Sequence, residues 1–278
     1  MLVSTKEILQ RAQQEKYAVA AFNVYNLETV QAAVRAAEQE NQPVIIALGE
    51  RYFPTVDVEG FAAFVQALAA KSSVPIALHL DHAYEKESII RAIRCGFTSV
   101  MFDGSNFDLE ENIRLTKEIT EIAHMAGVSV EAEIGSLAKG DFSDEEEGDG
   151  TLTDPQSAKD FVNATGVDFL AAAIGTVHGM YKGEPKIDLA LLEQIQQAVT
   201  VPLVLHGGSG TPDEIVKQAI QLGICKVNVN TEVSMAAVSY LQNYFDDKTI
   251  VHLSTVMAET QQAMEPIMTK FVRLFANK

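Results

Sequence analysis

The feature that most constrains the fold is a regular alternation of short apolar runs with longer segments whose apolar residues recur at helical spacing. Short apolar runs separated by helical patterns are typical of parallel strands joined by crossover helices. The chain contains about eight such units, enough to close a (β/α)8 TIM barrel, which is an α/β fold. The predicted strands are residues 17–22, 43–48, 75–81, 99–102, 128–134, 168–174, 202–205 and 226–229.

The helical segments and the tail complete this interpretation. An open doubly wound sheet is the main competitor, but no Gly-x-Gly-x-x-Gly turn follows the first strand. We therefore expect a single barrel domain over 1–278, with 232–278 as a C-terminal helical extension. We interpret this extension as two helices that form an oligomer arm, with Pro266 starting or kinking the second. The predicted barrel helices are residues 26–39, 61–70, 85–95, 108–126, 155–165, 187–199 and 211–222, after a first helix at 4–16.

Composition excludes several classes of protein. The formal net charge of −17 argues against nucleic-acid binding, which favours a clustered basic surface. This charge does not exclude a small anionic ligand, because exposed charges are screened beyond about 10 Å at ordinary salt. No apolar run approaches the roughly 20 residues that a membrane span needs. Cys95 and Cys225 lie far apart in apolar segments, so we expect a cytoplasmic protein without disulfides.

Histidines follow three of the predicted strands. His82, His178 and His206 stand at the ends of strands three, six and seven, and a barrel brings its strand ends into one ring. Three neutral imidazoles with an open fourth position are typical of a catalytic zinc site. The sequence therefore predicts metal ligation by these three residues. Other polar residues at strand ends are Asn23, Asp81, Asp103, Ser105, Glu131, Glu133, Asn228 and Asn230.

A glycine-rich turn follows the seventh strand. His206-Gly207-Gly208-Ser209-Gly210 leads into Thr211-Pro212-Asp213, which has the features of a helix start. Backbone amides and the positive end of a helix attract phosphate, and barrels of this kind often bind phosphate after strands seven and eight. The eighth strand ends in Asn228-Val229-Asn230-Thr231. We expect a phosphate site between these two turns.

Five stretches together resemble class II, metal-dependent ketose-bisphosphate aldolases: Leu78-His79-Leu80-Asp81-His82, Val130-Glu131-Ala132-Glu133-Ile134-Gly135, Gly175-Thr176-Val177-His178-Gly179, the turn at 206–210 and the turn at 228–231. The resemblance implies retro-aldol cleavage of a ketose 1,6-bisphosphate to dihydroxyacetone phosphate and glyceraldehyde 3-phosphate. It also implies that His82, His178 and His206 hold Zn²⁺ and that Asp81 carries the proton of the C4 hydroxyl. Asp103 and Glu133 match ligands of a second site, for a divalent or monovalent cation. The positions that match the dihydroxyacetone phosphate site are Gly179, Gly207, Gly208, Ser209, Asn228, Val229, Asn230 and Thr231.

The residue types favour metal chemistry over a lysine Schiff base. A metal ion can stabilise the negative charge left when the C3–C4 bond breaks. A Schiff base needs a lysine at the C-terminal end of a barrel strand. Strand six, residues 168–174, contains none, and Lys226 is expected at the entrance of strand eight, which is the opposite end.

Two stretches depart from the pattern that the resemblance implies. In the acidic loop, residues 138–149, a carboxylate should carry the C3 proton, and the candidates are Asp141, Glu145, Glu146 and Glu147. After strand two, Leu48-Gly49-Glu50 replaces a serine or threonine that often contacts phosphate. For the distal phosphate we consider Lys182 and Arg273.

Several substrates and one other function stay open. The residues 228–231 resemble fructose-bisphosphate members, whereas residues 101–105 resemble the tagatose-1,6-bisphosphate or 5-dehydro-2-deoxyphosphogluconate branches. We favour fructose. A non-catalytic sugar-phosphate-binding barrel would not need Asp81 beside the metal ligands, and a metal-dependent hydrolase would want a His-x-His pair after strand one. We expect a homodimer or homotetramer.

Overall fold

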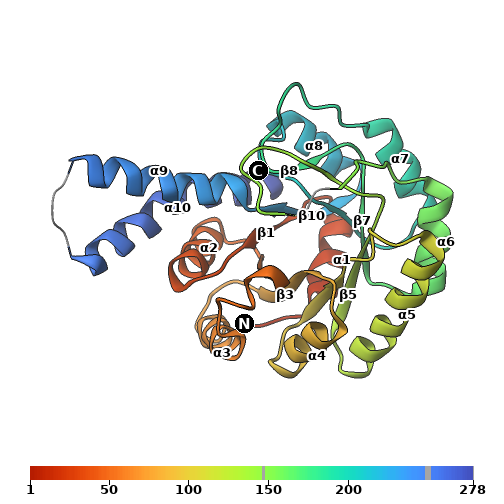
Figure 1. Ribbon diagram of the computed structural model, residues 1–278, viewed down its shortest axis with the longest axis horizontal. Helices are drawn as coiled ribbons and strands as arrows, with labels where there is room; N and C mark the ends of the chain where they lie inside the picture. Colours follow the sequence, from red (N-terminus) through yellow and green to blue (C-terminus); the bar gives the residue numbers. More distant parts are fainter. Residues whose placement is uncertain (146–147, 248–251, 278) are drawn as a thin grey trace.

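Eight parallel strands form a closed barrel in the computed structural model, which describes residues 1–145, 148–247 and 252–277 (Figure 1). Neighbouring strands follow chain order, and β10 pairs with β1 to close the ring, with Val19 opposite Lys226 and Ala21 opposite Asn228. The predicted (β/α)8 TIM barrel is therefore confirmed. The barrel strands are β1 (Val19–Asn23), β2 (Val44–Gly49), β3 (Ile76–Ala83), β4 (Ser99–Phe102), β5 (Ser129–Ile134), β7 (Phe169–Ala172), β9 (Leu203–Leu205) and β10 (Ile224–Val229).

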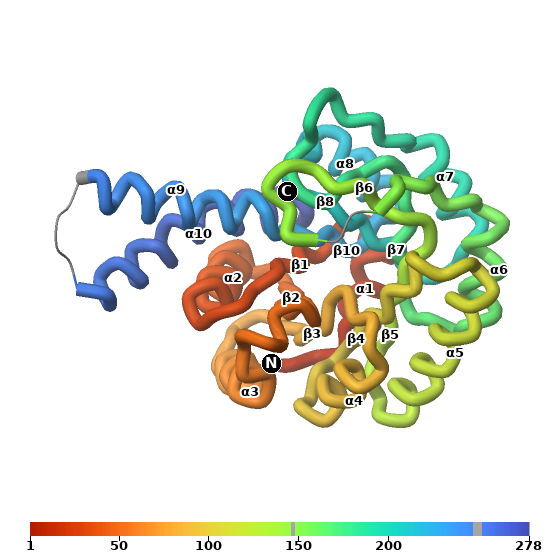
Figure 2. Tube along the Cα trace, in the orientation of Figure 1, coloured from red at the N-terminus to blue at the C-terminus, as the bar shows by residue number. Residues whose placement is uncertain are grey.

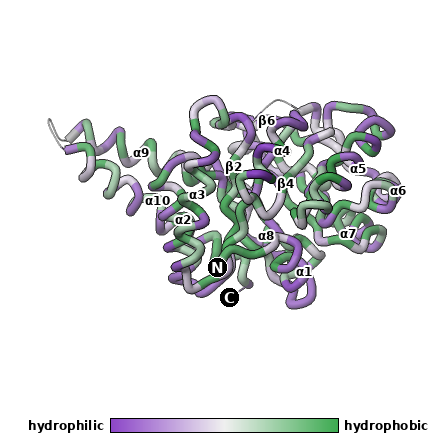
Figure 3. Tube along the Cα trace, turned by 90° about the horizontal axis from the view of Figure 1, so that it is seen from below, coloured by the Kyte–Doolittle hydropathy of each residue, from purple (hydrophilic) through white to green (hydrophobic). Residues whose placement is uncertain are grey.

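Helices cover the outside of the barrel because each has one apolar face. In α2, for example, Val30, Ala33 and Ala37 recur every three or four residues and are buried in the main core. Figure 3 shows the same pattern for the whole chain, with apolar strands inside and helices of mixed hydropathy around them. The helices are α1 (Thr5–Glu15), α2 (Leu27–Glu40), the 3-10 turn η1 (Glu50–Tyr52), α3 (Val58–Ala69), α4 (Lys86–Arg94), α5 (Leu109–Met125), α6 (Pro155–Thr165), α7 (Leu189–Ala198), α8 (Asp213–Gln221), α9 (Thr231–Asp247) and α10 (Leu253–Phe275).

The inside of the barrel has an apolar end and a polar end. Successive residues of a strand point to opposite faces, so alternate residues face the interior. Near the start of the strands these are apolar, such as Val19, Ala77 and Phe169, and α1 packs Ile8 and Leu9 against them. Towards the C-terminal ends the buried residues become polar and charged. Helix α1 thus closes the end of the barrel where the strands begin, and the buried polar and charged residues lie at the C-terminal end.

A small parallel sheet links two loops above the C-terminal end of the barrel. It consists of β6 (Ala138–Lys139) and β8 (Val177–His178). The Gly140 amide donates to the His178 carbonyl at 2.7 Å, and Asp141 and Met180 exchange two backbone hydrogen bonds of 2.8 Å. The acidic loop after β5 is therefore tied to the histidine-bearing loop after β7.

The helices α9 and α10 form an arm whose far ends project from the barrel (Figures 1 and 2). The returning half of α10 packs beside α2, where Arg35 binds Glu265 at 3.0 Å and Arg273 binds Glu40 at 2.7 Å. Pro266 does not start the second helix, which was one of the two predicted alternatives: α10 starts at Leu253 and contains Pro266 in its interior, where the other alternative places a kink. No helix within the described residues is both long and apolar enough to cross a bilayer.

Candidate active site

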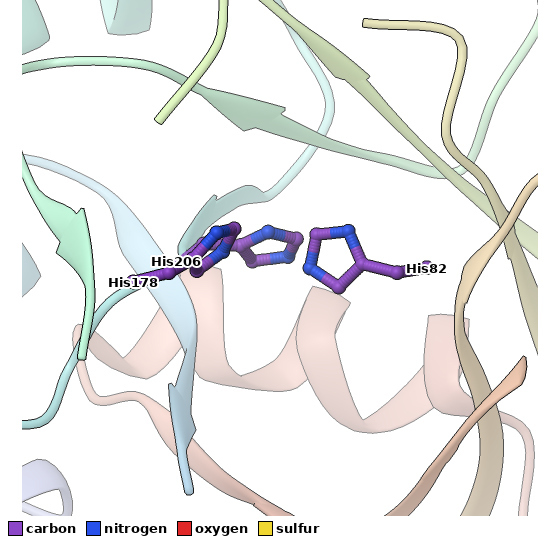
Figure 4. Close-up of side chains that lie close together, drawn as sticks. All are labelled: His82, His178 and His206. Atoms are coloured by element: carbon purple, nitrogen blue, oxygen red, sulfur yellow. The ribbon is translucent and has the colours of Figure 1, made fainter. Parts of the chain in front are cut away.

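Three histidines meet at the C-terminal mouth of the barrel (Figure 4). The ring centroid of His82 lies 4.6 Å from that of His206 and 5.1 Å from that of His178, and the last two are 5.9 Å apart. One nitrogen of each ring lies within 4.8 Å of the other two. Residues from three separate strand ends are thus close enough to share one ion.

A bulge in β3 turns two consecutive residues into the same cavity. In a regular strand Asp81 and His82 would point to opposite faces. Here the pairing of β3 with β4 shifts between Leu80 and Ala83, and His82 has a φ of 41°, in the left-handed region. This conformation costs of order 1–3 kcal/mol for a residue other than glycine, and such strain is typical of functional sites. Both side chains line the cavity as a result.

Carboxylates orient two of the three imidazoles. His82 Nδ1 donates to Asp103 Oδ2 at 2.7 Å, and His206 Nε2 donates to Glu131 Oε1 at 2.9 Å. These bonds leave His82 Nε2 and His206 Nδ1 as the ring nitrogens free to act as ligands. His206 Nδ1 and His178 Nε2 are buried without a hydrogen bond. Unpaired buried nitrogens on convergent rings fit a bound divalent cation.

Burial and charge set the protonation of these rings. Burial, with smaller contributions from the neighbouring His82 and His206 rings, holds the pKa of His178 well below its usual value, so this ring is neutral. Burial lowers the pKa of His206, but the hydrogen bond to Glu131 and the adjacent carboxylate of Glu133 outweigh burial and raise the pKa to about 10. Two neighbouring carboxylates therefore raise the basicity of the His206 ring, as is common for histidines that bind a metal.

A second group of possible ligands adjoins the first. One ligand atom each from His82, Asp103 and Glu133 also lies within 4.8 Å of the other two. Burial raises the pKa of Glu133, with a smaller contribution from the charge of Asp103. Its Oε2 lies 2.9 Å from His206 Nδ1, yet neither atom has a partner with hydrogen-bond geometry. This arrangement can hold a second cation beside the three histidines.

Asp81 is fixed between two amides. Asn23 Nδ2 donates to Asp81 Oδ2 at 2.7 Å, and Asn228 Nδ2 donates to Oδ1 at 3.0 Å. Burial raises the pKa of Asp81, but the adjacent His82 imidazole and the His79 imidazole, whose Nε2 lies 3.6 Å from Asp81 Oδ1, lower it well below the usual value. Asp81 is therefore an oriented, ionised carboxylate at neutral pH.

Lys226 lies below Asp81, and the prediction that it stands at the entrance of its strand is wrong. β10 begins at Ile224 instead of residue 226, and its pairing with β9 shifts beside Lys226. The Lys226 Nζ donates to Glu131 Oε2 at 2.7 Å and lies 3.9 Å from Asp81 Oδ1. His79 completes the cluster, with Nε2 at 3.5 Å from Glu131 and Nδ1 at 2.8 Å from Ser99. The lysine is a buried counter-ion and not an exposed nucleophile.

The predicted phosphate residues surround the same cavity, with two differences. A Cβ on Gly207 would lie 2.1 Å from the Val177 carbonyl oxygen, so this close approach requires glycine. The Gly208 amide, however, already donates to the Asn228 carbonyl at 2.9 Å. Val229 packs its side chain in the main core and does not line the cavity. The lining residues are Asn23, Asp81, His82, Ser143, Asp144, Glu145, His178, Gly179, Gly207, Gly208, Ser209, Asn228, Asn230 and Thr231.

Among the four acids predicted to carry the C3 proton, Glu145 is the described residue that lines the cavity. A carboxylate oxygen of Glu145 lies within 4.8 Å of ligand atoms of both Asp81 and His82. The Asp141 side chain is 55% exposed and lies 3.9 Å from Lys182. Glu146 and Glu147 lie outside the described residues. Of the two residues considered for the distal phosphate, Lys182 is 69% exposed, and Arg273 borders a separate cavity beside α2, α8 and α10.

Sequence reasoning missed Arg51 and Tyr52, which follow β2. Arg51 forms an ion pair with Glu145, and the Tyr52 hydroxyl donates to Asp144. Asn230 donates to the same Asp144 side chain at 3.1 Å. An arginine just beyond a barrel strand was the available signal, because strand ends of this kind face the site.

Comparisons with known proteins identify the family of this chain. The sequence model of the family described as "Fructose-bisphosphate aldolase class-II" matches residues 3–278. The solved structure of the YdjI aldolase from Escherichia coli K12 is 37% identical with a TM-score of 0.89, over 99% of this chain and 97% of that one. A protein from Coccidioides immitis assigned as a fructose-1,6-bisphosphate aldolase is 34% identical with a TM-score of 0.89, over 98% and 95%. The fructose-bisphosphate aldolase of Campylobacter jejuni, at 23% identity and a TM-score of 0.82 over 99% and 95%, shares the fold. The chain therefore belongs to the class II fructose-bisphosphate aldolase family.

Proposed function

We propose that this protein is a zinc-dependent aldolase that cleaves fructose 1,6-bisphosphate to dihydroxyacetone phosphate and glyceraldehyde 3-phosphate. The observation that carries the proposal is the convergence of His82, His178 and His206 around one point, with the Asp81 carboxylate in the same cavity. The family supports the aldol reaction, and the protein from Coccidioides immitis, assigned to fructose 1,6-bisphosphate, supports this choice of sugar.

The three histidines would hold Zn²⁺, which supplies a Lewis acid for the substrate oxygens on which negative charge develops. Asp81 would accept the proton of the C4 hydroxyl as the C3–C4 bond breaks. Its amide partners Asn23 and Asn228 keep the carboxylate oriented toward the cavity. Asp103 and Glu133 would hold a second cation in reach of His82.

The glycine-rich side of the cavity would bind the dihydroxyacetone phosphate end. Because Gly207 has no side chain, the backbone of the turn at 206–210 can lie against the Val177 carbonyl in the loop after β7. Asn230 and Thr231 lie at the start of α9. Residues of this kind favour an anion because backbone and side-chain N–H groups and a helix N-terminus converge. The residues that we propose for this end are Gly179, Gly207, Gly208, Ser209, Asn228, Asn230 and Thr231, without Val229, whose side chain packs in the core.

Glu145 would carry the C3 proton of dihydroxyacetone phosphate. It is buried, borders the cavity and lies close to Asp81 and His82. The exposed Asp141 lies beside Lys182 instead, which argues against Asp141 as the proton carrier.

The arm supports an assembly with further copies of the chain. Val238 and Phe245 of α9 and Leu253 of α10 are 49%, 59% and 70% exposed. Large apolar side chains in such numbers on a projecting element favour a protein interface. We propose a homodimer or homotetramer that acts in the cytoplasm, where the free Cys95 and Cys225 would stay reduced.

A coupled assay tests the reaction. Zinc-loaded protein is incubated with fructose 1,6-bisphosphate, tagatose 1,6-bisphosphate and 5-dehydro-2-deoxygluconate 6-phosphate in parallel, and dihydroxyacetone phosphate is measured. We expect cleavage of the fructose substrate, loss of activity with a chelator and recovery with Zn²⁺. Activity that survives chelation, or inactivation by borohydride in the presence of substrate, would contradict zinc dependence. Cleavage of none of the three sugars by metal-loaded protein would favour a non-catalytic binding barrel.

A further inference from the structure

A second cavity adjoins the cavity at the histidines. This neighbouring cavity has a volume of about 440 Å³ and shares Asp144, Asn230 and Thr231 with the first. The cavity at the histidines has a volume of only about 30 Å³, far below the several hundred Å³ that are usual for a ligand pocket. The neighbouring cavity is therefore the space into which a substrate can extend beyond its reacting carbons.

Three aromatic rings line the neighbouring cavity. Tyr25 follows β1 and Tyr52 ends η1 after β2, and their ring centroids lie 5.1 Å apart at an interplanar angle of 58°. Phe142, from the acidic loop, is 75% exposed and has a φ of 58°, in the left-handed region. A bulky residue rarely adopts this conformation, and such strain is typical of functional sites. The acidic loop thus holds an exposed apolar ring beside a cavity whose occupant would cover it.

The charges around both cavities favour an uncharged occupant. None of the described residues that line either cavity is a lysine or an arginine, and Arg51, which is bound by Glu145, lines neither. Asp144 lies at the boundary between the two, and a carboxylate accepts hydrogen bonds from hydroxyl groups but repels an anion. The other polar residues of the neighbouring cavity carry amides and hydroxyls, which also bind hydroxyl groups: Asn26, Tyr25, Tyr52, Thr55, Asn230, Thr231 and Ser234.

We propose that this protein also acts on ketose 1-phosphates longer than a hexose, whose distal carbons carry hydroxyl groups and no charge. The neighbouring cavity binds this distal tail, with the rings of Tyr25, Tyr52 and Phe142 against its C–H groups and Asp144 as an acceptor for its hydroxyls. This inference rests on the proposed aldol function and adds a second class of substrate to it.

The reaction is the proposed aldol cleavage with a different leaving aldehyde. The C4 hydroxyl gives its proton to Asp81, and the electron pair of the C3–C4 bond stays on the dihydroxyacetone phosphate half. Glu145 supplies a proton to C3, and the tail leaves as an uncharged hydroxyaldehyde. Condensation runs through the same steps in reverse, so aldehydes of chosen length and charge probe the neighbouring cavity.

Condensation with three aldehydes tests this inference. Zinc-loaded protein is given dihydroxyacetone phosphate with glycolaldehyde, erythrose or erythrose 4-phosphate, and kcat/KM is referred to the concentration of free aldehyde. Glycolaldehyde supplies only C4 and C5 and therefore reports on the reacting centre, whereas the two four-carbon sugars differ only in the terminal phosphate. The variants are Phe142→Ala, Tyr25→Leu and Thr55→Lys. Phe107→Ala is the matched control, because Phe107 is 49% exposed and lines neither cavity.

We expect the wild type to use erythrose more efficiently than erythrose 4-phosphate. Phe142→Ala and Tyr25→Leu should lower kcat/KM for erythrose by about tenfold, because a ring that covers the tail is lost, and leave the value for glycolaldehyde unchanged. Thr55→Lys adds a cation to the wall of the neighbouring cavity and should reverse the preference between the two four-carbon sugars. Phe107→Ala should match the wild type with all three aldehydes.

Two results overturn the inference and leave the aldol function intact. One is a wild type that prefers erythrose 4-phosphate to erythrose. The other is a set of ring variants, Phe142→Ala and Tyr25→Leu, in which kcat/KM for erythrose is unchanged or falls no more than that for glycolaldehyde. The proposed function fails as well if the zinc-loaded wild type condenses no aldehyde, cleaves no sugar bisphosphate and exchanges no proton of dihydroxyacetone phosphate.

Discussion

Lys226 Nζ lies 2.7 Å from Glu131 Oε2 inside the barrel, and neither side chain is exposed to solvent. Removing one partner of such a pair leaves an uncompensated buried charge, which typically costs about 3–5 kcal/mol. We therefore predict that Lys226→Met lowers the free energy of unfolding by about this amount, measured by urea denaturation at pH 7. The double variant Lys226→Met/Glu131→Gln should recover part of the loss, because no bare carboxylate remains. A single variant as stable as the wild type would contradict this account.

The same pair predicts a pH dependence. Burial raises the pKa of Glu131, but the charge of Lys226 and the hydrogen bond from His206 lower it from 4.5 to about 2. A folded-state pKa below the unfolded value stabilises the protein above pH 4.5, and this contribution is lost as the pH falls from 4.5 toward 2. The difference in unfolding free energy between wild type and Lys226→Met should therefore shrink on acidification. A difference that grows as the pH falls would show that another group dominates.

Asp103 should control metal affinity through His82. Its Oδ2 accepts from His82 Nδ1 at 2.7 Å, and this bond fixes the ring orientation and tautomer. We predict that Asp103→Asn weakens Zn²⁺ binding by about 10-fold to 100-fold, measured by competition with a chromophoric chelator. Asp154→Asn, at the exposed N-cap of α6, is the matched control and should bind zinc like the wild type. Unchanged affinity in Asp103→Asn would remove Asp103 from the metal site.

The barrel and the convergence of the three histidines could be predicted from the sequence because both follow from local patterns. Short apolar runs between helical segments mark the strands, and closure of the barrel brings distant strand ends together. The position of Lys226 was misjudged because a register shift beside it is not visible as a change in apolar pattern. Arg51 was missed for a different reason, since its partner Glu145 belongs to a distant loop and long-range pairing leaves no periodic signal.

Gly208 should be intolerant of any side chain. A Cβ there would lie 2.5 Å from the Asn228 carbonyl oxygen and 2.6 Å from Val227 Cγ1, so the turn would have to move away from β10. We predict that Gly208→Ala raises KM for the sugar bisphosphate at least about tenfold, as expected when a charged ligand loses its hydrogen bonds. Gly183→Ala is the control, because a Cβ at that position has nothing within 4 Å. Equal steady-state kinetics in the two variants would place the phosphate elsewhere.

Asp81 and Glu145 border one cavity but are proposed to move different protons, so their variants should separate two reactions. Asp81→Asn should lower cleavage by about 10²-fold to 10⁴-fold, the usual contribution of general acid–base catalysis, and leave exchange of the C3 proton of dihydroxyacetone phosphate intact. Glu145→Gln should abolish that exchange as well as cleavage, with zinc still bound. Deuterium incorporation into dihydroxyacetone phosphate, followed by NMR, measures the exchange directly.

Asp141→Asn provides the matched control for this pair of variants. Its side chain is 55% exposed and faces Lys182, so both reactions should proceed as in the wild type. Loss of exchange in Asp141→Asn, with exchange retained in Glu145→Gln, would transfer the role of proton carrier to Asp141. The loop would then have to turn during the reaction, because Asp141 is held by two backbone hydrogen bonds to Met180 that direct its side chain away from the histidines.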